Sequence, residues 1–176
     1  MVNNGEGPSQ DAPGDLERVR ELLNTWLVPN DTRRPTDLFD AYADRHGIPP
    51  DERAALRALR DDLRAAVERE PGAEERVTEW IGRLGVGVAV TGGALAFRHP
   101  GGPAAGTLGT VLEAVALGRW PRMKACPDCR WVFYDSTRNA GKRWCLMTAG
   151  GPDGRSCGSI AKVRRHRRKH ATGTAP

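Results

Sequence analysis

All four cysteines of the chain lie in its last third, and their spacing limits what that region can fold into. Cys126 and Cys129 form a Cys-Pro-Asp-Cys pair, whereas Cys145 and Cys157 follow singly. Two thiolates separated by two residues can bind one Zn²⁺, and two further thiolates complete a tetrahedron. The spacing therefore predicts one structural zinc ion that all four sulfurs hold, with no coordination position left for a substrate.

Two other uses of the cysteines have to be considered. Two disulfides would require an oxidising compartment, and the first 15 residues lack the basic and apolar regions of a secretory signal, so we expect a cytoplasmic protein. A thioredoxin-like Cys-x-x-Cys pair would precede a helix in a βαβ unit, whereas a basic, aromatic segment with strand character follows Cys129. The spacing favours zinc, and at this point both alternatives remain open.

Charge is distributed unevenly along the 176 residues. Residues 119–176 contain 14 Lys and Arg against 3 Asp, whereas residues 1–118 contain 13 Lys and Arg against 19 Asp and Glu. A basic module with a metal site is typical of a domain that binds a polyanion such as nucleic acid. No apolar run approaches the length that crosses a membrane, so a soluble protein is expected.

Helical periodicity dominates the N-terminal part of the chain. Residues 1–14 are rich in Gly, Pro, Asn and Ser and are predicted to be disordered. Apolar residues then recur at helical spacing, and each apolar stripe is expected to pack in a core, so these helices are predicted to fold without the cysteine-rich region. The predicted helices begin at Asp15, at the cap Thr36 and at Asp51, a fourth ends before Gly85, and a fifth begins at the cap Thr107 and ends at Gly118.

Two segments of the chain alternate between apolar and small or polar residues, as strands do. Val86, Val88 and Val90 alternate before a Thr-Gly-Gly turn, and the pattern resumes at Leu95 and Phe97, which predicts a β-hairpin. Near the cysteines, segments 130–135 and 142–145 also have strand character and are predicted to pair across a polar turn. A helix is predicted from residue 159 to residue 170.

Together these patterns predict an α+β fold. A mostly helical domain with one β-hairpin is expected over residues 15–118. A small ββα, treble-clef-like, four-cysteine finger is expected over residues 119–170, followed by a disordered tail at 171–176.

The predicted C-terminal helix carries cations around most of its surface. This distribution suits contacts with phosphates on both sides of a groove better than base recognition along one stripe, and cations of the predicted finger hairpin could extend the same surface. His166 and His170 are too far from the cysteine pair for a Cys₂His₂ finger and are expected to face solvent or phosphate. The candidate nucleic-acid-binding residues are Arg130, Arg138, Lys142, Arg143, Lys162, Arg164, Arg165, Arg167, Arg168 and Lys169.

Patterns that are typical of enzymes are absent from the sequence. It contains no HExxH motif, no phosphate-binding glycine loop and no convincing nucleophile–base pattern, so no enzymatic activity is expected. An RNA-binding or protein-interaction zinc module is the alternative that composition leaves open.

The segment CPDCRWVFYDSTRNAGKRWC, with Cys157-Gly158 and the helix AKVRRHRRKH after it, resembles the CGNR zinc-finger proteins. These are described as bacterial transcription regulators that carry the finger behind a mostly helical domain called ABATE. The run Leu23-Asn24-Thr25 resembles the Asn-Thr signature near the start of that domain. The resemblance implies double-stranded DNA as the partner of the finger and a small-molecule ligand for the N-terminal domain, with Asn24 and Thr25 as ligand-binding residues.

The sequence departs from the family pattern at two places. Ser159 and Ile160 stand where the family has Asn and Arg, so any polar contact of those two side chains is missing. Eleven residues separate Cys145 from Cys157, more than is usual in the family. Because extending a flexible, Gly-rich loop costs only tenths of a kcal/mol, zinc binding is expected to persist, and the departures bear on how the helix docks on its partner.

Overall fold

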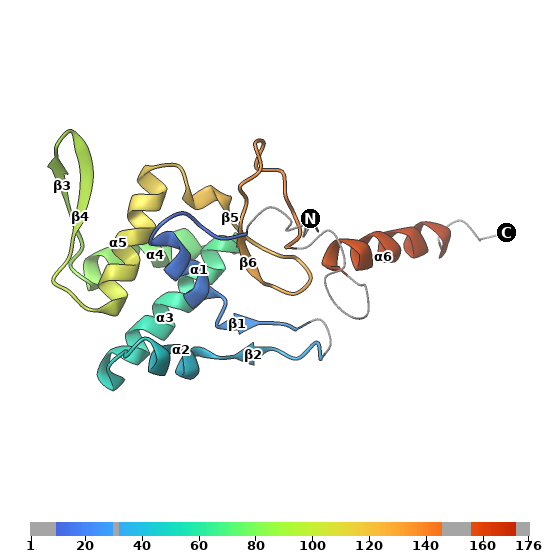
Figure 1. Cartoon of the computed structure of the whole chain (residues 1–176), viewed down its shortest axis with the longest axis horizontal. Helices are drawn as coiled ribbons and strands as arrows, with labels where there is room; N and C mark the ends of the chain where they lie inside the picture. Colours follow the sequence, from blue (N-terminus) through green and yellow to red (C-terminus); the bar gives the residue numbers. More distant parts are fainter. Residues whose placement is uncertain (1–9, 30–31, 146–155, 172–176) are drawn as a thin grey trace, which may run out of the picture.

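The computed structural model describes residues 10–29, 32–145 and 156–171 (Figure 1). The predicted disorder of residues 1–9 and 172–176 and most of the insertion before Cys157 lie outside these residues. Residues 10–14 pack against the protein instead of being disordered, because Ala12 is buried and the Gln10 carbonyl accepts a hydrogen bond from the Tyr134 N–H.

The described chain combines helices with small antiparallel hairpins, as predicted for its fold class. None of its helices is long and apolar enough to cross a membrane. The helices are α1 (Leu16–Leu23), α2 (Phe39–Arg45), α3 (Pro50–Val67), α4 (Ala73–Arg83), α5 (Pro103–Ala116) and α6 (Cys157–Ala171), with a 3₁₀ turn η1 (Trp120–Arg122). The hairpins pair β1 (Trp26–Leu27) with β2 (Thr36–Asp37), β3 (Gly87–Thr91) with β4 (Ala94–Arg98), and β5 (Met123–Ala125) with β6 (Val132–Tyr134).

Two helix boundaries differ from the prediction near the start of the chain. Trp26 lies in β1 and not in the first helix, because the Thr25 hydroxyl donates to the Leu22 carbonyl and closes α1. The predicted cap Thr36 lies in β2, and the Asp37 carboxylate accepts the Phe39 N–H at 2.9 Å where α2 begins.

The helix predicted to begin at Thr107 begins earlier. Pro103 occupies the first turn of α5, where a missing N–H costs nothing, and the preceding Gly102 has a φ of 87° that disfavours other residues. The β3–β4 hairpin is confirmed, and it projects from the body of the protein with Val88 and Val90 exposed (Figure 1).

The apolar core centres on α1, which packs against α3 and α5 (Figure 1). Leu22 and Leu23 of α1 and Leu59 of α3 are almost fully buried in it. Met123 of β5 and Val132 of β6 belong to the same buried cluster. The core therefore continues from the N-terminal helices into the hairpin that carries the first two cysteines, which argues against independent folding of the N-terminal part.

The strand pairing predicted around the cysteines is wrong. Segment 130–135 does contribute a strand, but β6 pairs with the short β5 that precedes the cysteines, with Ala125 opposite Val132. Residues 142–145 form no strand. The Cys126–Cys129 pair therefore lies in the turn between β5 and β6, and a different set of contacts holds the segment that leads to Cys145.

Candidate metal centre

The turn between β5 and β6, residues 126–131, forms a zinc knuckle. The Cys126 N–H donates to the Trp131 carbonyl at 2.8 Å, and the Arg130 N–H donates to the Cys126 carbonyl at 2.9 Å. Arg130 has a φ of 62°, an uncommon value outside glycine, which turns the chain back toward β6. These bonds place the side chains of Cys126 and Cys129 on the same side of the turn.

The four sulfurs lie together as the spacing predicted. Their Sγ atoms all lie within 4.8 Å of one another, and the Cys129–Cys145 and Cys145–Cys157 distances are 3.5 and 3.7 Å. A tetrahedral Zn²⁺ with bonds of about 2.3 Å places its sulfurs about 3.8 Å apart, whereas a disulfide would need about 2.05 Å. All four cysteines are buried and free of disulfides, so they fit one structural zinc ion.

The electrostatics of the cluster explain why it needs a cation. Hydrogen bonds from Cys129 and Cys145 lower the pKa of Cys126, and the Cys126 sulfur in turn raises the pKa of Cys129 and of Cys145. The protein by itself thus favours one thiolate and resists the next two. The charge of Zn²⁺ offsets this repulsion, because a coordinating thiol is deprotonated by the metal.

Cys157 is the first residue of α6, where the helix dipole favours a thiolate. The preceding Ser156 holds this first turn. Its hydroxyl accepts the Ser159 N–H at 3.1 Å and lies 2.8 Å from the Ser159 hydroxyl, while its carbonyl accepts the Ile160 N–H. Ser159, which replaces the Asn of the family pattern, therefore supports the helix start.

A buried carboxylate organises the loop that carries Cys145. Asp135 is fully buried and accepts hydrogen bonds from the Lys124 ammonium at 2.7 Å, the Lys142 N–H at 2.8 Å and the Thr137 N–H at 3.0 Å. Burial by itself would raise the pKa of Asp135, but the bonds from Lys124 and Thr137 outweigh it and lower this pKa to about 2. The ionised carboxylate thus holds residues 135–142 as a loop. Asp135 and Lys124 could not be predicted from the sequence, because nothing in their local pattern marks them as partners.

Comparison with known proteins agrees with this geometry. Residues 122–170 match the family model of the CGNR zinc finger. A search of curated proteins found no match to the chain. We call residues 122–170 the CGNR finger; the ABATE resemblance of the N-terminal part stays a prediction.

The predicted nucleic-acid-binding residues of the CGNR finger fall into three groups. Arg130 forms an ion pair with Glu68 at 3.2 Å, and the half-buried Lys142 lies 5.4 Å from the centre of the Phe133 ring. Five others are exposed and form no ion pair within the described residues: Arg138, Arg143, Lys162, Arg165 and Arg167. Arg164, Arg168 and Lys169 follow the backbone of α6, but their side chains lie outside the described part of the structure.

The two predicted ligand-binding residues are buried at the end of α1. The Asn24 side chain bonds to both backbone groups of Val132, and the Thr25 hydroxyl donates to the Leu22 carbonyl and accepts from Arg60. Both side chains thus have partners within the protein, and their role in ligand binding stays a prediction.

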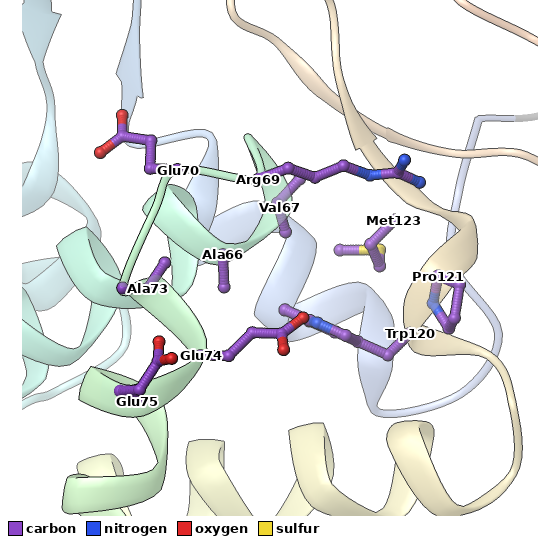
Figure 2. Close-up of a pocket in the computed structure, with 11 residues that line it drawn as sticks. Ala66, Val67, Arg69, Glu70, Ala73, Glu74, Glu75, Trp120, Pro121 and Met123 are labelled. Atoms are coloured by element: carbon purple, nitrogen blue, oxygen red, sulfur yellow. The ribbon is translucent and has the colours of Figure 1, made fainter.

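Two hollows lie elsewhere in the helical part. One of about 500 Å³ lies between the α3–α4 turn and η1, where Glu74, Trp120 and Met123 line it (Figure 2). The other, of about 530 Å³, lies among α1, α2 and α5, with Tyr42 and His46 in its lining.

Proposed function

We propose that the chain is a bacterial transcription regulator whose CGNR finger binds double-stranded DNA. The observation that carries the proposal is the excess of exposed, unpaired cations on the finger. Its described carboxylates, Asp128 and Asp135, are both engaged, with Arg33 and Lys124 respectively. No acidic side chain of the described finger therefore competes with phosphate for the exposed cations of the loop and of α6.

Some cations of the finger bond to its own backbone, whereas others are exposed at its surface, where they are free to contact phosphates. Arg122 and Lys124 donate to carbonyls of the 135–142 loop and act inside the finger. Arg138 lies at the surface of that loop, and Arg165 lies on the exposed part of α6. Since phosphate contacts carry no sequence information, we propose that these residues supply affinity that is similar on different sequences.

The proposal predicts a strong dependence of DNA affinity on salt. Log affinity of the zinc-loaded protein should fall linearly with log salt, and Arg138→Gln and Arg165→Gln should each reduce the slope by about 0.9 because each removes one phosphate contact. Fluorescence anisotropy with a preferred and a scrambled duplex over a salt series measures both slopes. The weakening should be similar on the two sequences.

Arg98→Gln is the matched control, because Arg98 is an exposed arginine on β4. It changes the net charge equally and should leave the slope unchanged. An affinity indifferent to salt, or equal effects of all three variants, would contradict phosphate contact by the finger. Preference for structured RNA would favour the RNA-binding alternative, and absence of any nucleic-acid binding would favour the protein-interaction alternative.

We also propose a small-molecule ligand for the N-terminal part, in the hollow of about 530 Å³ that Tyr42 and His46 line, a different place from Asn24 and Thr25. The buried Nε2 atom of His46 has no hydrogen-bond partner among the described residues, and burial raises the pKa of the Tyr42 hydroxyl. Screening amino acids, nucleotides and organic acids by thermal shift tests the proposal. A stabilising compound should lose its effect in Tyr42→Phe and keep it in Tyr134→Phe; stabilisation by none of them would sink it.

We further propose that the protein acts in the cytoplasm by binding, without a catalytic activity, in keeping with the sequence patterns described above. We propose a treble-clef-like finger, which is supported by a knuckle that supplies two cysteines and a first helical turn that supplies another.

A further inference from the structure

The Asn24 side chain forms two hydrogen bonds with the backbone of β6, next to the zinc knuckle, as a neighbouring strand would. Its Nδ2 donates to the Val132 carbonyl at 2.8 Å, and its Oδ1 accepts the Val132 N–H at 2.7 Å. Val132 is the first residue of β6 and lies three positions after Cys129. Both bonds are buried, so water does not replace them at low cost if either is lost.

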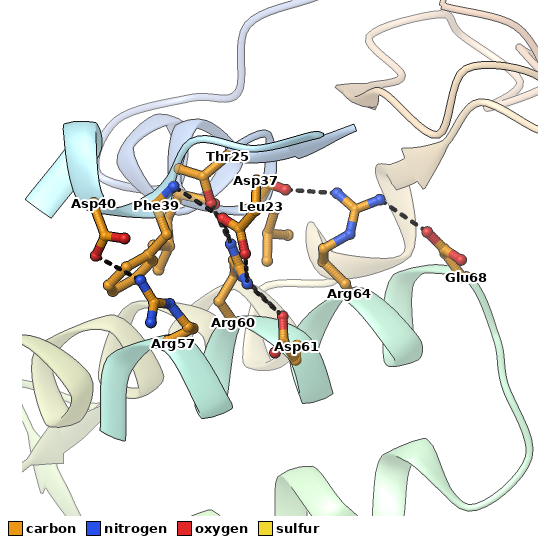
Figure 3. A network of polar contacts seen from close by, with 11 residues as sticks. Leu23, Thr25, Asp37, Phe39, Asp40, Arg57, Arg60, Asp61, Arg64 and Glu68 are labelled. Carbon is orange, nitrogen blue, oxygen red and sulfur yellow. Dashed lines mark hydrogen bonds and ion pairs between the residues drawn. The ribbon is translucent and has the colours of Figure 1, made fainter. Parts of the chain in front are cut away.

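Arg64 of α3 joins the same two parts of the chain. Its guanidinium donates to the Leu23 carbonyl at the end of α1, to the Glu68 carboxylate, and to the Arg130 carbonyl in the knuckle at 2.9 Å. Figure 3 shows the first two of these contacts beside the Arg60 cluster. The Arg64 side chain also lies 4.7 Å from the centre of the Trp26 ring, which fixes its direction. A single cation therefore ties α1, α3 and the knuckle together.

The segment after α1 contacts the knuckle at two further positions. The Val28 N–H donates to the Cys129 carbonyl at 3.0 Å, and Arg33 forms an ion pair with Asp128 at 3.0 Å. Asp128, Cys129, Arg130 and Val132 are thus all held by residues that lie between positions 24 and 64 of the chain. The β5 pairing holds the other edge of β6.

We infer that Asn24 and Arg64 are positioning residues of the zinc centre. They hold the knuckle in the shape that directs Cys126 and Cys129 at one point, so that loss of either residue weakens zinc binding. Outer contacts that orient metal ligands change metal affinity by about 10- to 100-fold when they are removed. The N-terminal helices therefore set how tightly the finger holds its metal, whether or not the finger binds DNA.

The test measures zinc affinity and zinc release in the full chain. Asn24→Ala and Arg64→Lys are purified with zinc, and transfer of the metal to a chromophoric chelator gives the dissociation rate and, by competition, the affinity. Asn24→Ala should bind zinc about tenfold more weakly and release it faster. Arg64→Lys keeps the charge but cannot reach both carbonyls in a fork, so it should shift both quantities in the same direction.

Leu56→Ala is the control that distinguishes a positioning role of Asn24 and Arg64 from a general loss of stability. Leu56 is almost fully buried in α3 and lines the hollow near His46, so its truncation should destabilise the protein without touching the knuckle. Urea unfolding of the zinc-loaded proteins ranks the three variants by stability. The inference is overturned if Asn24→Ala and Arg64→Lys lose no more zinc affinity than Leu56→Ala at a comparable loss of stability. If Asn24→Ala does not fold, Arg64→Lys decides the question.

Discussion

Removing zinc from the full chain is expected to unfold much more helix than the finger contains. Met123 and Val132 of the knuckle hairpin are part of the buried cluster that α1 and α3 build, and Asn24 bonds directly to Val132. Structural zinc contributes on the order of 10–16 kcal/mol of apparent binding free energy in finger peptides, which is comparable with the stability of a whole domain, about 5–15 kcal/mol. Far-UV circular dichroism during chelation under reducing conditions should therefore show loss of helix beyond α6, and zinc should restore it.

Cys129→Ser should reproduce this loss without a chelator. Metal analysis should return one equivalent of zinc from the reduced wild-type protein and far less from the variant. Ser136→Ala is the control, because Ser136 is exposed on the 135–142 loop of the finger and offers no metal ligand. Persistence of the full N-terminal helix signal in metal-free protein would show that the helices fold alone, as their apolar stripes suggested by themselves.

The second variant for which we expect a large loss of folding stability is Arg60→Ala. The Arg60 side chain is 1% exposed, and its guanidinium donates to both Asp37 oxygens at 2.7 and 2.9 Å and to the Thr25 hydroxyl at 2.8 Å (Figure 3). Its truncation leaves the buried Thr25 hydroxyl without its donor, and it removes the cation from Asp37, whose side chain is 42% exposed. Because the carboxylate that remains is open to solvent, we expect a loss of about 1–3 kcal/mol, and urea unfolding of zinc-loaded protein measures it.

Arg57→Ala provides the comparison one turn earlier on α3. Arg57 also pairs with an aspartate, Asp40, and stacks on the Phe39 ring at 4.5 Å, but its side chain is 40% exposed (Figure 3). Solvent-exposed pairs contribute about 0–1 kcal/mol, so this variant should lose little stability. Equal losses in the two variants would mean that burial of the Arg60 network does not determine its strength.

The metal ligands could be predicted from the sequence because their signal is local. Cys126 and Cys129 are two residues apart, and zinc chemistry allows few other partners for Cys145 and Cys157. The family pattern strengthened this expectation, and it correctly placed a helix after Cys157. The helical stripes and the β3–β4 turn were equally local, which is why these elements were found with errors of only a few residues at their ends.

The contacts that shape the knuckle could not be predicted in this way. Met123–Ala125 is too short to show an alternating pattern, so the wrong partner was chosen for β6. Arg60 and Arg64 carry no sequence sign of burial, since charged side chains usually face solvent. Asn24 had been noted only through resemblance, because its bonds join residues that are 108 positions apart.

The 108 positions between Asn24 and Val132 affect how the protein folds during its synthesis. A ribosome releases Asn24 and α1 long before it has synthesised Val132, and still longer before Cys157. Contacts between such distant residues form late and slow folding, because the chain between them must first be ordered. At synthesis rates of about 5–20 residues per second, the apolar face of α1 stays uncovered on the side that Val132 later packs against for at least several seconds. We therefore expect newly made chains to depend on chaperones during this interval, and a shortage of zinc to prolong it.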